Sequence, residues 1–208
     1  MENERVQVEP LARDHAPALA RAAGHDRRSY GYTWVPHGLA DAERYVEAGL
    51  AHQATGRALV QVVRRRSDDR IVGSTRFLDL DVFTWPPPWP PGVGVGPEPS
   101  DEQPPTVAEI GSTWYAPEVQ GSGINGEVKL LQLTHAFEVW GVRRVSFKTD
   151  ARNARSRAAI ERLGARLEGV RRAHVPAGDG SVRDSAYYSI IAGEWPAARE
   201  QLQARLAR

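Results

Sequence analysis

The 208-residue sequence contains no cysteine. That absence excludes disulfide bonds, thiolate metal sites and cysteine nucleophiles. The sequence also lacks an apolar run of membrane-spanning length, and its start, MENERVQVEP, has no basic segment leading into an apolar one. We therefore expect a soluble cytoplasmic protein that does not enter a membrane.

The chain also lacks a large excess of charge of either sign. It has 27 basic and 26 acidic residues, so nucleic acid is not an expected partner. The charges are unevenly distributed, because residues 68–109 hold eight acids and two arginines, whereas residues 143–184 hold eleven basic residues and five acids. The first region favours a cationic ligand and the second an anionic one, and the alternative for both is a solvated surface.

The hydrophobic pattern divides the chain into strands and helices of ordinary length. We expect N-caps at Asp14, Asp41 and Asn153. The alternation of the two kinds of element predicts one α/β domain with a mixed sheet. The expected strands are 6–10, 58–64, 71–80, 107–115, 142–149, 166–175 and 185–191, and the expected helices are 15–23, 39–53, 124–140, 154–163 and 197–208.

Residues 84–108 interrupt this pattern with a proline-rich insertion. Nine of these 25 residues are proline, which lacks the backbone donor that strands and helices need. Trp85 and Trp89 favour burial, so we prefer an ordered lid or rim. The alternative is a docking segment for a proline-recognising domain.

A glycine-rich turn, QGSGING at residues 120–126, lies between an expected strand and an expected helix. Glycine lets backbone N–H groups converge, and the start of a helix adds partial positive charge. Such a turn is suited to a phosphate group, although similar turns are common where nothing binds. It is neither a P-loop nor a dinucleotide-binding fingerprint, because the following residues and the spacing differ.

The chain resembles the GCN5-related N-acetyltransferases, in the branch of the ribosomal-protein alanine acetyltransferases and their small-molecule relatives. The resemblance rests on EIGSTWYAP, VQGSGIN, KLLQLTHAFEVWGVRRV, TDARNARSRAAIERLGARLEG and RDSAYYSIIAGEW, with VQVEPL and IVGSTRFLDL earlier in the chain. It covers nearly everything except residues 84–108. It implies a mixed, mostly antiparallel sheet with flanking helices, in which acetyl-CoA lies between two splayed strands and its acetyl group passes directly to an amine.

The resemblance also implies which residues hold acetyl-CoA as co-substrate. Trp114 and Tyr115 belong to the strand whose backbone meets the pantetheine arm, and Asn153 hydrogen-bonds that arm. The family usually has glycine or alanine where this chain has Asn125, which tolerates unusual backbone angles. The pyrophosphate is expected on the backbone of Gln120, Gly121, Ser122, Gly123, Ile124, Asn125 and Gly126.

Proton transfer needs an acid and a base. Many relatives use a tyrosine as the acid; here the corresponding stretch is NARS, and the resemblance implies that Ser156, also near the cofactor, takes that role. Glu109 and His174 are the candidate bases, the first as a carboxylate beside the acceptor and the second by its intrinsic pKa. A chain of water molecules is the alternative to both.

The acceptor site is expected in the segment SYGYTWVPHG, where Tyr30, Tyr32 and Trp34, together with Glu109, would receive an amine through cation–π contact. A packed aromatic loop is the alternative. The acids of residues 79–109 would attract a cationic acceptor. The adenosine 3′-phosphate would meet arginines among Arg143, Arg144, Arg152, Arg155 and Arg157.

The expected reaction is acetyl transfer to a protein N-terminus or a small amine, without a metal. The alternative is a non-catalytic acyl-CoA-binding or interaction domain, because the acid tyrosine is missing. Exposed edge strands leave room for a homodimer.

Overall fold

The computed structural model describes residues 1–208 except 25, 84–99, 101–102 and 208, and every structural statement below concerns the described residues. Most of the proline-rich insertion expected at residues 84–108 lies outside them. Its two interpretations, as a lid and as a docking segment, therefore stay predictions.

Seven strands form one twisted sheet in the order β1-β2-β3-β4-β5-β7-β6. Only β4 and β5 pair in parallel, and every other neighbouring pair is antiparallel. The expectation of a mixed, mostly antiparallel sheet is thus confirmed. The strands are β1 Val6–Pro10, β2 Leu59–Arg65, β3 Arg70–Asp81, β4 Val107–Tyr115, β5 Arg144–Asp150, β6 Arg166–Pro176 and β7 Val182–Ile191.

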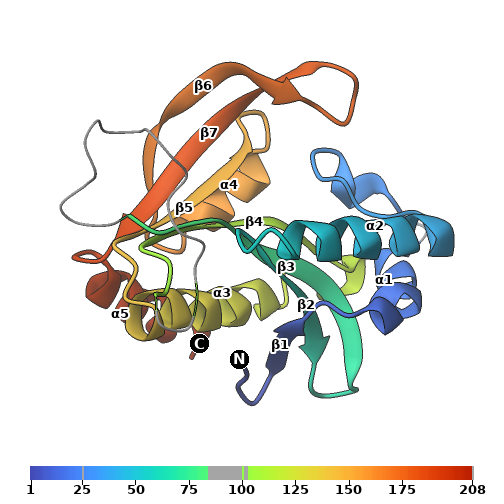
Figure 1. Ribbon diagram of the computed structural model, residues 1–208, viewed down its shortest axis with the longest axis horizontal. Helices are drawn as coiled ribbons and strands as arrows, with labels where there is room; N and C mark the ends of the chain where they lie inside the picture. Colours follow the sequence, from blue (N-terminus) through green and yellow to red (C-terminus); the bar gives the residue numbers. More distant parts are fainter. Residues whose placement is uncertain (25, 84–99, 101–102, 208) are drawn as a thin grey trace.

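Helices cover both faces of the sheet (Figure 1). On one face, α1 and α2 lie against β1–β3, where the hydroxyl of Tyr45 donates to Ser74 Oγ at 2.9 Å. On the other face lie α3, α4 and α5, where Tyr188 on β7 donates to Glu161 at 2.9 Å. No helix in the described part of the chain is long and apolar enough to cross a bilayer. The helices are α1 Ala16–Ala23, α2 Gly38–Gln53, α3 Ile124–Thr134, α4 Ala154–Glu161 and α5 Trp195–Leu206.

Three expected helix ends were wrong. Asp41 is not the N-cap of the second helix, because α2 already begins at Gly38; Asp41 lies in its first turn and accepts the backbone N–H of His37 at 3.1 Å. The first helix begins with a 3-10 turn at Arg13–His15. Asp14 lies inside this turn and does not cap the helix; the Nδ1 of His15 accepts the backbone N–H of Ala12 instead. The helix expected to reach residue 140 leaves α-geometry at Thr134 and continues as a π-turn over His135–Val139. This wider turn begins within the apolar run whose spacing had predicted an unbroken helix.

The C-terminal helix packs more closely than expected for a surface helix. Trp195, Ala198 and Leu202 of α5 are buried in the core beneath β5 and β7. A Cβ atom on Gly126 of α3 would lie 2.8 Å from a methyl carbon of Leu206. Glycine at this position therefore lets the end of α5 lie directly against the first turn of α3.

Candidate active site

The two parallel strands separate soon after they meet. β4 and β5 pair only through Val107–Arg144, Ala108–Val145 and Glu109–Ser146. Beyond Glu109 the register of β4 with β3 shifts, and Ser112 adopts a φ of +47°, the signature of a bulge. The strands diverge from this point, so one edge of β4 has no partner strand along its C-terminal half.

The bulge also changes which side chains face each side of the sheet. Before it, Glu109 lies on the α2 face, opposite Leu78 of β3. After it, Trp114 pairs with Ser74 and lies on that same face, although it is five positions, an odd number, beyond Glu109. Thr113 accordingly lies on the α3 face. An unbroken strand would have placed residues 109 and 114 on opposite faces.

A cavity of about 1000 Å³ occupies the wedge between the strands. Its walls come from the segment between α1 and α2, from β3, β4, β5 and β7, from the glycine turn, and from α3, α4 and α5. Most of the expected site residues line it. They are Tyr32, Trp34, Glu109, Tyr115, Gln120, Gly121, Gly123, Asn125, Gly126, Asn153 and Ser156.

The glycine turn forms one end of this cavity. Gly121 has a φ of +82° and Gly123 a φ of +88°, in the left-handed region that glycine adopts without strain. Gly123 is the N-cap of α3 and supplies no side chain to satisfy the first N–H groups of the helix. Those groups have no carbonyl partner within the helix. Apart from the N–H of Ile124, which contacts Ser122 Oγ at 3.5 Å, they therefore remain available to an anion in the cavity.

The N-terminal segment braces the turn. Arg5 donates to the carbonyl oxygen of Ser122 at 3.0 Å and to Glu127 Oε1 at 3.0 Å, and Asn3 donates to Glu127 Oε2 at 3.0 Å. These contacts join residues more than a hundred positions apart in the sequence. They hold the turn and the first turn of α3 in a fixed relation to β1.

Among the five arginines expected near a phosphate, Arg155 lines the cavity. Its guanidinium donates to the side chain of Gln120 at 2.8 Å and to the carbonyl of Ser29 at 3.1 Å. The other four are not among the described lining residues, which instead include Arg162 and Arg205. Arg144, Arg152 and Arg157 bond to Glu168, Asp150 and Tyr188 respectively.

Asn153 and Ser156 begin α4 where it meets the cavity. The side-chain oxygen of Asn153 accepts the backbone N–H of Ser156 at 3.0 Å, which confirms the predicted N-cap. That bond leaves the amide NH₂ of Asn153 for another partner. The Ser156 side chain also lines the cavity, so a hydroxyl and an amide lie together beside the opening between the strands.

Glu109 is the buried carboxylate of the cavity, with 2% of its surface exposed. Its Oε1 lies 3.1 Å from the ammonium of Lys148, which also approaches Asp79 at 4.0 Å. Burial raises the pKa of Glu109, and the nearby Lys148 partly opposes that increase. A carboxylate whose pKa is raised is a stronger proton acceptor than an exposed one.

His174 lies on β6 and is not among the described residues that line the cavity. Its Nδ1 contacts Ser185 Oγ at 3.0 Å, and its Nε2 contacts Arg171 at 3.2 Å and Tyr187 at 3.3 Å. Desolvation and the charge of Arg171 lower its pKa. The structure thus brings Glu109 and Ser156 to one cavity and places His174 beyond its wall.

The aromatic residues expected at the site divide into two groups. Tyr32 and Trp34 line the cavity, and the ring of Trp34, 63% exposed, stacks on Tyr45 with centroids 6.0 Å apart. Tyr30 and Trp114 are buried beside it. The Tyr30 hydroxyl donates to the Tyr115 carbonyl at 3.0 Å, and burial raises its pKa to about 12, so it remains a donor. Tyr30 therefore stabilises the C-terminal end of β4 without being among the described lining residues.

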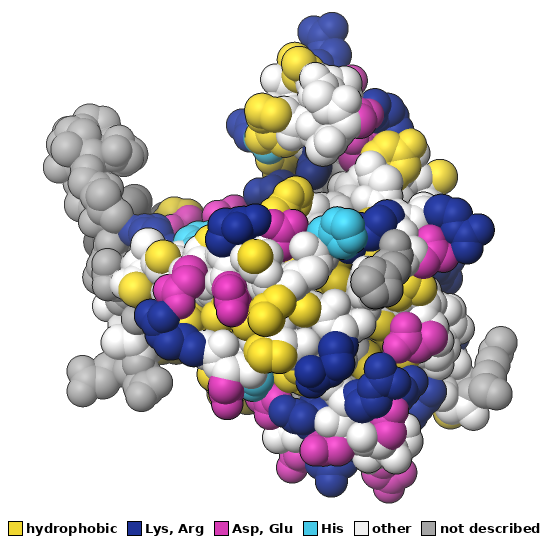
Figure 2. Space-filling view, turned by 90° about the vertical axis from the view of Figure 1, so that its right-hand side faces the viewer, with side chains coloured by type: hydrophobic (Ala, Val, Ile, Leu, Met, Phe, Trp, Pro, Cys, Tyr) yellow, Lys and Arg dark blue, Asp and Glu magenta, His cyan; other side chains and the backbone are white. Residues whose placement is uncertain are grey.

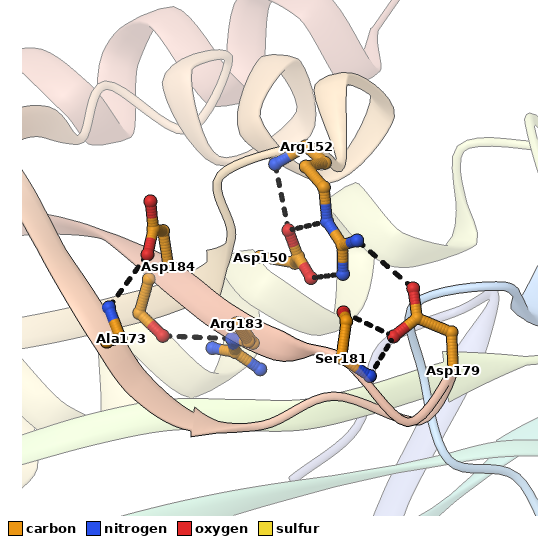
Figure 3. A network of polar contacts seen from close by, with 8 residues as sticks. Asp150, Arg152, Ala173, Asp179, Ser181, Arg183 and Asp184 are labelled. Atoms are coloured by element: carbon orange, nitrogen blue, oxygen red, sulfur yellow. Dashed lines mark hydrogen bonds and ion pairs between the residues drawn. The ribbon is translucent and has the colours of Figure 1, made fainter.

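The β6–β7 hairpin is tied to the rest of the site by an arginine (Figure 3). Arg152 bonds Asp150 at the end of β5 and Asp179 at the hairpin tip, at 2.8 and 3.0 Å. Its guanidinium also lies over the ring of Tyr32, 5.5 Å from the centroid. Figure 2 views the molecule from the side of α1 and α2 and shows the hairpin projecting above them. The hairpin and the α1–α2 segment therefore border the same side of the cavity.

Of the six acids expected to attract a cation, two besides Glu109 have basic partners, and three, at positions 98, 101 and 102, lie outside the described residues. Asp79 faces Lys148, and Asp81 bonds Arg57. Of the described acids within residues 79–109, only Glu109 lines the cavity. The described part of this acidic stretch therefore contributes one carboxylate to the cavity wall.

Lys129 is a buried lysine that sequence reasoning missed. It lies on α3 beneath the bulge, 4% exposed, and donates to Thr75, Thr113 and Gln132 at 2.9, 2.9 and 2.8 Å. All three acceptors are uncharged. Burial without a carboxylate lowers the pKa of Lys129 to about 7. Its hydrogen bonds join α3 to both strands at the point where β4 bulges.

This burial predicts a pH-dependent stability. Between about pH 7 and pH 10.5 the unfolded chain binds a proton at Lys129 that the folded chain has lost, so the free energy of unfolding should rise with pH, by at most about 1.4 kcal/mol per unit. Lys129→Met should abolish this rise. Urea unfolding at a series of pH values measures it, with Lys148→Met as the control that keeps the rise. An unchanged pH dependence in Lys129→Met would contradict the assignment.

Comparisons with known proteins agree with the geometry. The profile of the family described as "Acetyltransferase (GNAT) domain" matches residues 5–166. A curated relative, "Putative ribosomal N-acetyltransferase YdaF" of Bacillus subtilis (strain 168), is 38% identical over 88 residues, which are 42% of this chain and 47% of the relative. That alignment thus spans about half the length of the curated relative.

Solved structures share the fold over nearly the whole chain. A GCN5-related N-acetyltransferase from Brucella melitensis is 25% identical, with a TM-score of 0.79 over 99% of this chain and 84% of that one. Mycobacterium smegmatis RimJ, solved in complex with CoA-disulfide, is 24% identical, with a TM-score of 0.73 over 96% of this chain and 88% of that one. The second likeness concerns the fold alone.

Proposed function

The chain belongs to the GNAT acetyltransferase family, and from this premise we propose that it transfers the acetyl group of acetyl-CoA to a primary amine. The amine belongs to a protein N-terminus or to a small molecule. One observation carries the proposal: the cavity between β4 and β5 is lined at one end by the glycine turn and at the other by a buried carboxylate.

The cavity has the chemistry that an acyl-CoA needs. The free N–H groups at the start of α3, with Arg155 beside them, suit the pyrophosphate. The unpaired edge of β4 offers backbone donors and acceptors to the amide groups of the pantetheine arm, and the Asn153 amide adds a donor. Acetyl-CoA supplies the activated acyl group, because its thioester carbonyl is open to attack by an amine.

The residues at the other end of the cavity accept and donate the protons of the reaction. Glu109 takes a proton from the ammonium form of the acceptor, directly or through a water molecule, and leaves a nucleophilic amine. Backbone N–H groups of β4 near the bulge stabilise the negative charge that develops on the carbonyl oxygen. Ser156 donates its hydroxyl proton to the departing thiolate and regains a proton from the N–H₂⁺ group of the tetrahedral intermediate, so that the hydroxyl is restored as the amide forms. The products are an N-acetylated amine and CoA.

The proposal is tested by measuring CoA release from acetyl-CoA with a panel of peptides bearing free N-termini, polyamines and aminated small molecules. Mass spectrometry identifies the acetylated product, and calorimetry measures acetyl-CoA binding. Amine-dependent CoA release with a product heavier by one acetyl group is expected. Binding without release on any amine would favour an acyl-CoA-binding domain, and absence of binding would overturn the assignment of the glycine turn.

Replacing Ser156 tests the acid. Ser156→Ala should lower kcat about 10- to 100-fold with little change in the KM for the amine, the low end of general acid catalysis because a thiol of pKa about 8.5 leaves readily. The matched control is Ser67→Ala, at an exposed position in the β2–β3 turn. Steady-state kinetics of both variants are compared with the wild type, and equal kcat values for Ser156→Ala and the control would remove Ser156 from the mechanism.

A further inference from the structure

The acceptor end of the cavity carries more positive than negative charge. On the α2 face of the sheet, the described charged residues that line it are Arg76, Lys148 and Arg183 against the single carboxylate of Glu109, whereas Lys129 lies on the α3 face. The ion pair between Lys148 and Glu109 neutralises both. Two arginines therefore remain without a compensating acid among the described residues of this end.

The strand register places these groups along one face of the sheet. Arg76 of β3 lies opposite Gly111, two positions from Glu109 on β4. Glu109 lies opposite Ser146, two positions from Lys148 on β5. Residues at alternate positions share a face, and diagonal neighbours on adjacent strands are about 7–8 Å apart. The Arg76 side chain thus starts about that far from the proposed proton acceptor.

The Arg76 guanidinium packs on an aromatic ring, and its described contacts include no acid. Its guanidinium carbon lies 5.0 Å from the centroid of Tyr45, the ring on which Trp34 stacks. Its Nε is buried and has no hydrogen-bond partner, and no ion pair reaches it within the described part of the chain. A buried arginine nitrogen without an acceptor costs free energy that an anionic ligand would recover.

Arg183 approaches from the opposite side of the cavity. Its Nε donates to Ser185 Oγ at 2.9 Å, and Ser185 in turn contacts His174 at 3.0 Å (Figure 3 shows Arg183 beside the hairpin network). The neighbouring acid Asp184 accepts the backbone N–H of Ala173. The terminal nitrogens of Arg183 have no acid partner among the described residues, and its charge acts on Glu109.

We infer that the acceptor amine carries, a few bonds from its nitrogen, an oxyanion that binds Arg76 and Arg183 while the amine approaches Glu109. The oxyanion is a carboxylate or a phosphate, since planar guanidinium groups bind both with paired hydrogen bonds. This inference rests on the proposed function. It disfavours polyamines, whose several positive charges would meet two uncompensated arginines.

Matched pairs of acceptors test the inference. Phosphoethanolamine is compared with ethanolamine, and phenylalanine with phenylalaninamide, so that each pair differs in its anionic group; the two pairs also distinguish phosphate from carboxylate. The anionic member of one pair should have a kcat/KM at least about tenfold higher. Arg76→Met should lower that value about 10- to 100-fold and lower that of the neutral member far less, so that the preference for the anionic member is lost. Arg66→Met, at an exposed arginine, should keep the preference.

A binding readout separates failure of the inference from failure of the proposed function. Trp34 stacks on Tyr45, the ring that Arg76 contacts, so tryptophan fluorescence should report titration with the anionic compounds in the presence of CoA. Arg76→Met or Arg183→Met should weaken that binding. Binding of the anionic compounds without CoA release would overturn the acetyl-transfer proposal only. Equal affinity for anionic and neutral members, or unchanged affinity in both folded variants, would overturn the inference.

Discussion

Glu109→Gln is expected to lower kcat/KM by about 100- to 10,000-fold, the range of general base catalysis. The amide has nearly the same shape but cannot accept the proton of the attacking ammonium group. Stability should fall only modestly, because the lost ion pair with Lys148 is offset in part by removal of the buried charge whose desolvation raises the pKa of Glu109. Acetyl-CoA binding should also persist, since the glycine turn lies at the other end of the cavity. Steady-state kinetics and calorimetry measure the two effects separately.

The pH profile gives this prediction a second readout. Activity requires ionised Glu109, so the kcat/KM of the wild type should rise with pH through the pKa of this carboxyl group, which lies above its usual value of 4.5. Glu109→Gln should lose that part of the profile. Glu47→Gln, at an exposed carboxylate of α2, is the matched control and should behave as the wild type. A Glu109→Gln enzyme with unchanged activity would make a water chain the proton acceptor.

Gly73→Ala is expected to destabilise the protein by about 3 kcal/mol, the upper end for added volume in a packed interior. An added Cβ would lie 2.3 Å from the carbonyl oxygen of Trp114 and 2.8 Å from the ring of Tyr115. The first of these atoms is backbone, so β3 and β4 have to move apart beside the C-terminal half of β4. Urea unfolding measures the loss, and weaker acetyl-CoA binding should accompany it.

The control for this substitution is Gly193→Ala. At Gly193 a Cβ would meet nothing within 4 Å, and the backbone does not adopt a left-handed conformation. Its stability should remain within about 0.5 kcal/mol of the wild type, as for most surface substitutions. If Gly73→Ala were as stable as this control, the two strands would be less tightly paired than the structure has them.

The sequence predicted the features of the site that depend on neighbouring residues. The glycine turn, the cap at Asn153 and the strand 107–115 each need only a short stretch of chain, and all three were found where expected. Ser156 was selected through the resemblance to a family, and Glu109 as a carboxylate on the strand expected to flank the acceptor. Their placement in one cavity supports the roles proposed for them.

Other features depend on contacts that no local pattern records. Lys129 looks like an ordinary helical lysine, and only the packing of α3 beneath β3 and β4 buries it. Arg76 sits in an acidic stretch of sequence, yet the acids beside it pair with Lys148 and Arg57. The bulge at Ser112 reverses the alternation of β4, and a strict period of two cannot show such a change.

The course of α3 has a consequence for cooperativity of folding. Ile124 and Val128, in its first half, pack into the core formed with β1–β3, whereas Leu133, at its end, packs into the core formed with β5 and β7. Within the sheet, strands β1–β4 are joined to β5–β7 by three residue pairs of β4 and β5. β3 and β4 also contribute to both cores, through Val72 and Phe77 and through Trp114 and Ile110 respectively. α3 is therefore the helix that, together with these two strands, couples the unfolding of the two cores, and the helix start proposed to bind the cofactor belongs to that connection.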